Sequence, residues 1–415
     1  MKNQFWLKVA FSQFVVIALI GVTIRLIFIG WDVGFDYKNL VHAHSHVGFL
    51  GWISMAIYVG LLHQFIPNSK DNKTYQRIFI GTEISILGML MSFPVQGYGL
   101  YSISFSTLFL LTSYWFVIKF YKSLKKESSG LTSTKFAKAA LIYLVLSSLG
   151  PWALGPTMAT GHGKDSLYYL IIFFYLHFLY NGAIIMALFA MIFKYLETQG
   201  GAIKKWNQNG RKVFLLLNSS VIPTYALSTL WTEPNAWLYW LGGLFAIVQC
   251  VGWIYFLPFG KNLLNQARHQ NIWAYRLLSL SGIAFSLKLI FQFLSAFPFF
   301  VSDIALLKNT IVMGYIHLVT LGVISFFLIG WFLLLKGFNS QRLSAKIGLW
   351  IFVAGVFLSE FYLFGNGLRT WLGKPPFDFA TQLALVSSLM PIGLILFLVG
   401  QRQKTIPGDT QRTVR

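Results

Sequence analysis

The sequence predicts an all-α polytopic membrane protein, with twelve transmembrane helices arranged as three four-helix quartets around a pseudo-threefold axis. Three observations lead to this fold class. Of the 415 residues, 56% are hydrophobic and only 11% are charged. Apolar runs long enough to cross a bilayer recur along the whole chain. Three of these runs, four helices apart each time, share one His-x4-Gly spacing. We therefore expect a single membrane domain over residues 1–415.

Each predicted helix corresponds to one apolar run of about 20 residues, the length that spans a bilayer. The first run follows only two lysines and lacks a small-residue cleavage site, so it is interpreted as a retained helix. The twelve helices are expected at approximately 8–29, 41–65, 78–96, 100–121, 138–157, 166–193, 213–231, 236–258, 273–297, 309–335, 345–365 and 379–400.

Lysine and arginine are distributed unevenly between the two sets of loops. Of 33 basic residues, 26 lie at the termini or at the loops after helices 2, 4, 6, 8 and 10, whereas five lie in the opposite loops. Because cytoplasmic loops collect basic residues, both termini are predicted to be cytoplasmic, in a bacterial inner membrane. The net charge of +21 then follows from topology and contact with anionic lipid, and no nucleic-acid partner is expected.

Three histidines occupy matched positions on predicted helices 2, 6 and 10. All three helices enter from the non-cytoplasmic side, so the histidines lie roughly 5 to 17 Å below that surface. Facing one another, they would form a ring of neutral nitrogen ligands suited to haem iron or copper. The following glycine either admits a flat macrocycle or allows a helix to approach closely. The pairs are His46 with Gly51, His177 with Gly182, and His317 with Gly322.

Predicted helix 2 carries three histidines on two faces. His42 and His46 are four residues apart and share one face, whereas His44 lies about 200° away from either. The segment can therefore supply ligands to two centres on opposite sides of the helix. The alternative is that one or two of these histidines cap the helix end or bind interfacial water.

Two short motifs in this helix carry a family resemblance. "HSHVGFLGW", residues 44–52, is similar to the H-x-H-x-G-x-L-G-W stretch of C-type haem-copper oxidases and nitric oxide reductases, and "HAHSH" resembles the opening of the NnrS family. The catalytic subunit of haem-copper oxidases has twelve helices in pseudo-threefold quartets, with histidine ligands on helices 2, 6, 7 and 10. If the chain is catalytic, the resemblance implies a respiratory electron-transport oxidoreductase of the terminal oxidase or nitric oxide reductase type.

The resemblance also implies cofactors and partners. Haem would be held non-covalently, as b-type haem, because the chain has no CxxCH motif, and copper is a second candidate. The single cysteine, Cys250, excludes a cysteine-rich metal site. Besides the lipid bilayer, an electron-donor cytochrome or a companion membrane subunit would be a partner.

Carried over by position, the resemblance makes His46 and His317 axial ligands of a haem and places His177 at the copper position. The chain departs from the family on helix 10, which offers only His317 where the family has two histidines. His44 is the candidate for the missing ligand. On helix 7 the family has adjacent histidines, so the familiar three-histidine copper site is not expected here. The residues at that point are Asn218, Ser219 and Ser220.

Other polar residues lie within the predicted helices. Lys288 and Gln292, four residues apart on helix 9, form a stripe that could conduct protons or hold a haem propionate. The alternative for Lys288 is an ion pair with Glu360. Tyr180, close to His177, is either a proton or electron donor or a packed core aromatic residue.

Two further classes of protein remain open. Twelve helices with internal repeats also describe secondary transporters, which place polar residues near the membrane midplane and usually repeat in twos. The second open class is a non-catalytic protein that handles haem or metal. The threefold spacing and the shared depth of the histidines favour a haem-binding redox protein.

Overall fold

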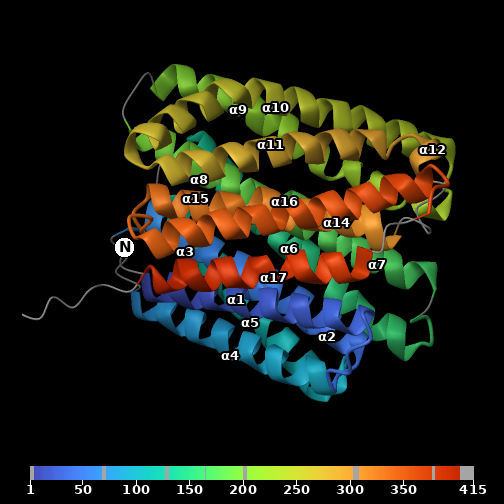
Figure 1. Ribbon diagram of the computed structural model, residues 1–415. Coiled ribbons are helices and arrows are strands. Elements are labelled where there is room, and N and C mark those ends of the chain that lie inside the picture. Colours follow the sequence, from blue (N-terminus) through green and yellow to red (C-terminus); the bar gives the residue numbers. More distant parts are fainter. Residues whose placement is uncertain are drawn as a thin grey trace, which may run out of the picture.

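The computed structural model describes residues 4–67, 72–126, 130–163, 165–199, 203–301, 308–375 and 379–401. Every regular element in these ranges is helical, and twelve helices in them are long and apolar enough to cross a membrane. The predicted all-α fold with twelve spans is confirmed, and the chain is an integral membrane protein (Figure 1).

Eight spans are uninterrupted α-helices: α1 (Gln4–Phe28), α4 (Asn72–Gln96), α5 (Leu100–Lys126), α6 (Thr132–Ala159), α10 (Ala236–Gln270), α11 (Ile272–Leu294), α16 (Leu343–Trp371) and α17 (Phe379–Val399). Spans 2 and 6 are composite: α2 (Tyr37–His46), η1 (Val47–Ser54) and α3 (Met55–Phe65), then α7 (Ser166–His177), η2 (Phe178–Ile184) and α8 (Ile185–Thr198). Spans 7 and 10 are also composite: α9 (Ile203–Val221), η3 (Pro223–Ser228) and η4 (Leu230–Thr232), then η5 (Lys308–Val312), α14 (Met313–His317), η6 (Leu318–Ser325) and α15 (Phe326–Leu334). A short helix, α12 (Pro298–Val301), follows α11.

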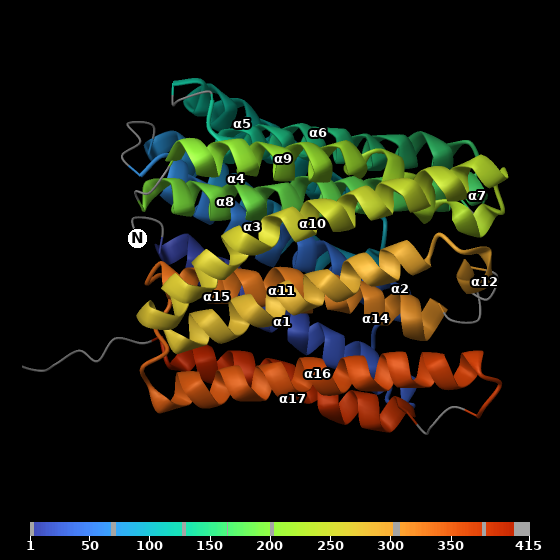
Figure 2. The same ribbon diagram turned by 90° about the horizontal axis from the view of Figure 1, so that it is seen from above.

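The packing of the spans repeats every four helices. Span 1 contacts span 2, as 5 contacts 6 and 9 contacts 10; spans 3 and 4, 7 and 8, and 11 and 12 also pair. The quartets join where α5 meets α6, α10 meets α11, and α17 meets α1. In Figure 2, α16 and α17 lie along one edge of the bundle and α5 and α6 along the opposite edge. This cyclic pattern is the predicted pseudo-threefold arrangement of three quartets.

Spans 2, 6 and 10 form the centre of the bundle. Their most apolar stretches are 78, 89 and 78% buried, and no other span in the described ranges exceeds 44%. Within this centre, α3 contacts both α8 and α15. The other nine spans therefore surround these three and shield them from lipid.

A π-helical turn directly follows each of the three aligned histidines, a feature that the periodicity does not predict. His46, His177 and His317 are the last residues of α2, α7 and α14, and η1, η2 and η6 follow them. In two of these turns a serine hydroxyl donates to the carbonyl five residues earlier, at 2.8 Å: Ser54 to Phe49 and Ser325 to Thr320. Such turns widen a helix locally and are frequent at functional sites.

The glycines of the three repeats lie inside these π-helical turns and allow close helix packing. A Cβ atom would lie 3.2 Å from Ile86 at Gly51, 2.7 Å from Tyr143 at Gly182 and 3.1 Å from Ala284 at Gly322. Each of these neighbours belongs to an adjacent span. Of the two roles considered for the glycines, the structure therefore supports close approach of helices over room for a macrocycle.

Two spans differ in form from the expected helices. The region expected as one helix over 213–231 lies within a span over Asn207–Thr232, but its α-helix, α9, ends at Val221. Pro223 has no N–H to donate, and two 3₁₀ turns follow it. Span 8, expected at 236–258, continues to Gln270, since an α-helix can extend beyond the hydrophobic layer where its residues become polar.

All three aligned histidines lie toward one end of the bundle. Figure 1 shows α2, α7 and α14 at the end away from the N-terminus, while α3, α8 and α15 lie at the N-terminal end. Because the spans alternate in direction, the links after spans 2, 4, 6, 8 and 10 share the N-terminal end. The cytoplasmic location of this end remains a prediction, which rests on the excess of lysine and arginine in these links.

A buried hydrogen bond joins the two π-helical turns of spans 2 and 10. Trp52 Nε1–H donates to Ser325 Oγ at 2.9 Å, and the indole stacks on Phe14 of α1, with ring centroids 4.8 Å apart. Trp52 and Ser325 are both 1% exposed. A buried N–H without an acceptor costs free energy, so this contact fixes the two helices relative to each other.

Ser325→Ala should lower the free energy of unfolding by about 1–3 kcal/mol, because it leaves the indole N–H buried without a partner. Chemical denaturation in detergent measures this, with Ser12→Ala at an exposed site of α1 as the control. In a Trp52→Phe background the serine substitution should cost clearly less. Equal stability of the Ser325→Ala and Ser12→Ala variants would contradict the role of this bond.

Candidate functional site

Four of the predicted histidines line one cavity in the half of the bundle away from the N-terminus, with a volume of about 530 Å³. They are His42, His44, His46 and His317. The volume lies within the range of about 300–1,000 Å³ typical of cofactor and small-molecule sites, and most of the wall is apolar. The cavity wraps around the end of α2, so both histidine-bearing faces of that helix border it.

His44 faces α1, and a backbone carbonyl of α1 holds the imidazole ring in place. Its Nδ1 lies 2.9 Å from the carbonyl oxygen of Ile17, which can only accept, so Nδ1 carries the proton and Nε2 keeps its lone pair. The ring fits there because residue 21 is glycine: a Cβ atom on Gly21 would lie 3.0 Å from His44 Cε1. An imidazole fixed through one nitrogen in this way presents the other as a metal ligand.

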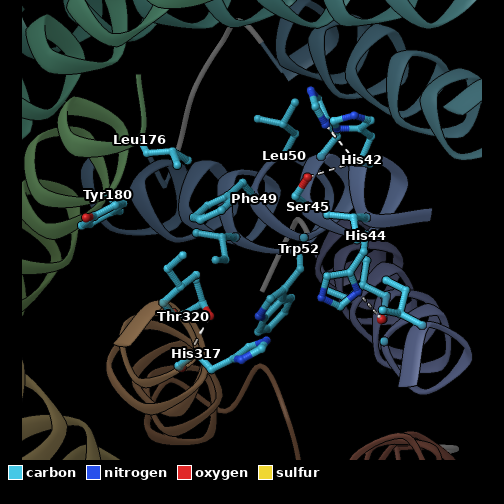
Figure 3. Close-up of a pocket in the computed structure, with 18 of the residues that line it drawn as sticks. His42, His44, Ser45, Phe49, Leu50, Trp52, Leu176, Tyr180, His317 and Thr320 are labelled. Atoms are coloured by element: carbon cyan, nitrogen blue, oxygen red, sulfur yellow. Dashed lines mark hydrogen bonds between the residues drawn. The ribbon is translucent and has the colours of Figure 1, made fainter. Parts of the chain in front are cut away.

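His317 reaches the same part of the cavity from span 10. Figure 3 shows His44, Trp52 and His317 among the side chains that line the cavity. In the part of the chain that the structure describes, His317 Nδ1 is buried without a hydrogen-bond partner. Buried polar atoms are nearly always paired, so an unpaired imidazole nitrogen beside a cavity is a candidate ligand-binding atom.

His42 and His46 occupy the opposite face of α2, as their spacing predicts. His46 Nδ1 donates to the carbonyl of His42 at 2.9 Å, and its ring packs on Phe93, with centroids 4.4 Å apart. Both imidazoles contact the ring of Tyr98, at centroid distances of 4.6 Å for His42 and 5.8 Å for His46. The resemblance pairs His46 with His317, whereas in Figure 3 His44 lies on the side of α2 that faces His317.

His177 is not among the residues that line the cavity. Its Nε2 donates to the carbonyl of Val221 at 2.7 Å, and its Nδ1 accepts from Asn181 at 3.2 Å. Val221 is the last residue of α9, where Pro223 interrupts the helix. The Thr224 hydroxyl also donates to this carbonyl, at 3.2 Å, so His177 is one of two side chains that satisfy the end of α9, and both of its ring nitrogens are used by protein atoms.

The other predicted polar residues divide between the cavity and the core. Tyr180 lines the cavity (Figure 3), whereas Lys288 and Gln292 are buried away from it. Lys288 Nζ donates to Gln292 Oε1 at 2.5 Å and lies 5.7 Å from the Phe285 ring centroid. No ion pair joins Lys288 to Glu360 among the described residues, and both Glu360 carboxylate oxygens are buried without a hydrogen bond.

Three cavity residues were missed as site residues. Arg25 of α1 lines the cavity, and its charge inside an apolar run was the available signal. Tyr98 and Gly21 also line it. Neither left a signal in the sequence, because one lies in a short link between spans and the other in an ordinary apolar helix.

The expected ring of three histidine ligands does not form in the described part of the chain. No three His, Cys, Asp or Glu side chains there converge closely enough to hold one metal ion. The reason is that His177 bonds the Val221 carbonyl of α9, so span 6 contributes Tyr180 to the cavity wall but not its histidine. The arrangement suits two axial ligands better than a three-histidine metal centre.

The structure is similar to a solved heme-copper terminal oxidase dimer determined by cryo-electron microscopy. The match has a TM-score of 0.67 at 13% sequence identity and covers 97% of this chain and 84% of that chain. No protein-family model matches the sequence, and no curated protein matches it. The chain therefore shares the fold of a heme-copper oxidase.

Gln292→Leu should destabilise the protein by at least about 1–3 kcal/mol, because it leaves the buried Lys288 ammonium without its acceptor. Lys288→Met roughly keeps the volume and removes the charge, so it should cost little. The double variant should therefore be more stable than Gln292→Leu alone, as measured by thermal unfolding in detergent. If Lys288→Met were the least stable of the three, the lysine would have a stabilising partner that this geometry lacks.

Proposed function

We propose that the protein is a haem-binding membrane redox protein that holds one non-covalent b-type haem between His44 and His317. The observation that carries the proposal is the cavity bordered by both imidazoles, one with its free Nε2 fixed by the Ile17 carbonyl and the other with an unpaired buried nitrogen. The shared fold with a heme-copper terminal oxidase supports it.

The residues present fit such a group. Iron in b-type haem takes imidazole nitrogen as an axial ligand, and the apolar wall suits the porphyrin. The stacked Trp52 and Phe14 both border the cavity and give it a rigid aromatic wall. Gly21 leaves the room that the His44 ring needs. Arg25 presents up to five N–H donors to the cavity, which match a propionate carboxylate.

The haem would supply one-electron transfer, and the chain would set its potential. His44, with Nδ1–H bonded to a carbonyl, is a stronger electron donor to iron than a free imidazole. The apolar surroundings exclude water, and Arg25 adds a positive charge. Electrons would come from a donor cytochrome or a companion membrane subunit, and we retain the bacterial inner membrane with cytoplasmic termini as the location.

Copper at the position of His177 does not fit this chain. Both ring nitrogens of His177 are hydrogen-bonded, to Val221 and Asn181. Span 7 offers Asn218, Ser219 and Ser220 and then breaks at Pro223. We therefore assign no oxygen or nitric oxide reduction to a binuclear centre, and an NnrS-like role in haem handling remains within the proposal.

A secondary transporter is the second candidate, and the geometry favours it less. A carrier would place its polar groups near the midplane on broken helices related by a twofold repeat. Here the packing repeats three times, and the cavity histidines lie toward one end of the bundle.

The purified protein, expressed with adequate haem, should show a Soret band and a low-spin signal in magnetic resonance of the oxidised iron. His44→Ala and His317→Ala should each abolish or convert that signal, because each removes one axial ligand. His42→Ala and His46→Ala, on the other face of the same helix, are the matched controls and should keep it. Gly21→Val should weaken haem binding by displacing the His44 ring.

The absence of a Soret band in the wild-type protein would falsify the haem proposal. Loss of one and the same signal in the His46→Ala and His317→Ala variants, with His44→Ala unchanged, would instead restore the pair predicted from the sequence.

A further inference from the structure

The geometry points to a second metal site on the other face of α2, in which His42, His46 and Tyr98 bind one divalent transition-metal ion at the cavity wall. The ligands would be two imidazole nitrogens and one phenol oxygen, with a fourth position open to the cavity. This site shares no ligand with the proposed haem, and it does not depend on haem being bound.

The two histidines are arranged as a chelating pair. They are separated by one turn of α2, so their side chains lie on the same face of the helix. Because His46 Nδ1–H donates to the His42 carbonyl, the lone pair of His46 Nε2 points outward. No hydrogen bond engages either ring nitrogen of His42 within the described residues, although the ring is half-buried. Both imidazoles border the cavity.

The distance between His46 and Tyr98 is that of a long hydrogen bond, and it also suits two ligands of one metal ion. Tyr98 Oη lies 3.4 Å from His46 Nε2, beyond the usual range of hydrogen bonds between oxygen and nitrogen. Two ligand atoms, each about 2.0–2.1 Å from a tetrahedral metal ion, are about 3.3–3.4 Å apart. A metal ion could therefore bind both atoms with little movement of either side chain.

Tyr98 is held in place by the tight turn between α4 and α5. Gly97 adopts a φ of +57°, which other residues rarely adopt, and Ser102 Oγ donates to the Gly97 carbonyl at 2.5 Å. Ser102 Oγ also accepts from Gly99 N–H at 2.9 Å. The phenol ring packs against Phe93, with centroids 5.2 Å apart. A ligand fixed by its surroundings in this way loses little conformational entropy on binding a metal ion.

The ligand set selects the class of metal. Imidazole and phenol favour borderline divalent ions such as copper(II) and zinc(II), and the general order of stability puts copper(II) above zinc(II). Neutral imidazole does not compensate the ion's charge, so phenol deprotonation should accompany binding and release one proton. A copper-bound phenolate produces a charge-transfer absorption band, which reports directly on Tyr98.

Copper(II) should bind the chelator-treated, full-length protein in detergent with one tight equivalent, and show a charge-transfer band and a magnetic resonance spectrum with nitrogen couplings. His42→Ala and His46→Ala should each weaken binding by at least about tenfold, as expected even for loss of an outer-shell partner. Tyr98→Phe should remove the band while retaining weaker binding.

Two control variants separate this site from other copper-binding groups. His162→Ala removes the exposed imidazole that pairs with Asp165 at 2.6 Å, and His269→Ala removes an exposed imidazole in the last turn of α10, away from the cavity. Both should bind copper(II) like the wild type. The same titration on haem-free protein should give the same result, so a missing Soret band bears on the haem and not on this site.

Copper binding that survives in both the His42→Ala and the His46→Ala variants, or that is lost with His162→Ala, would overturn the proposal. So would the absence of a tight equivalent in the wild-type protein. Circular dichroism of each variant shows whether the helices are intact, which separates the loss of a ligand from the loss of structure. Tyr98→Phe, which removes only a hydroxyl group, should keep the wild-type spectrum.

Discussion

The π-helical turns after His46 and His317 are the constraint on which the rest of the site depends. An extra residue in a turn interrupts the α-helical ladder, and in these two spans a serine hydroxyl bonds the carbonyl five residues back. The same turns carry Trp52 and Ser325, whose buried hydrogen bond connects spans 2 and 10. The cavity lies beside this hydrogen bond. The bond fixes the rotation of spans 2 and 10 relative to each other.

The three repeats have diverged although their backbone is shared. Each has a histidine, a π-helical turn and a glycine packed against a neighbouring span. In the second repeat, however, the α-helix of the partner span ends at Val221, and His177 and the Thr224 hydroxyl both donate to the Val221 carbonyl. A polar group inside a membrane must be satisfied by protein, so the broken helix determines the role of this histidine. The same threefold arrangement of helices thus gives its histidines two roles. His177 of span 6 stabilises the end of α9, whereas the histidines of spans 2 and 10 line a cavity.

Span 2 separates two chemical environments around one helix. On the α1 side, His44 lies among apolar and aromatic residues with Arg25 nearby, which suits a large flat cofactor. On the other side, His42 and His46 lie against Phe93 and Tyr98, where the spacing suits a single small ion. Because the alternate histidines point in opposite directions, neither face can supply its ligands to the other.

The sequence by itself determined the twelve spans, the quartet repeat and the two faces of span 2, because apolar length and helical periodicity are local properties. It also identified five of the cavity residues: His42, His44, His46, Tyr180 and His317. Only the tertiary structure decided that His44 lies with His317, that His177 caps α9, and that Lys288 bonds Gln292 instead of pairing with Glu360. These outcomes depend on the rotation of each helix and on where a neighbouring helix breaks. Rotation is set by packing among distant segments, such as Gly21 against His44, and no spacing within one helix encodes it.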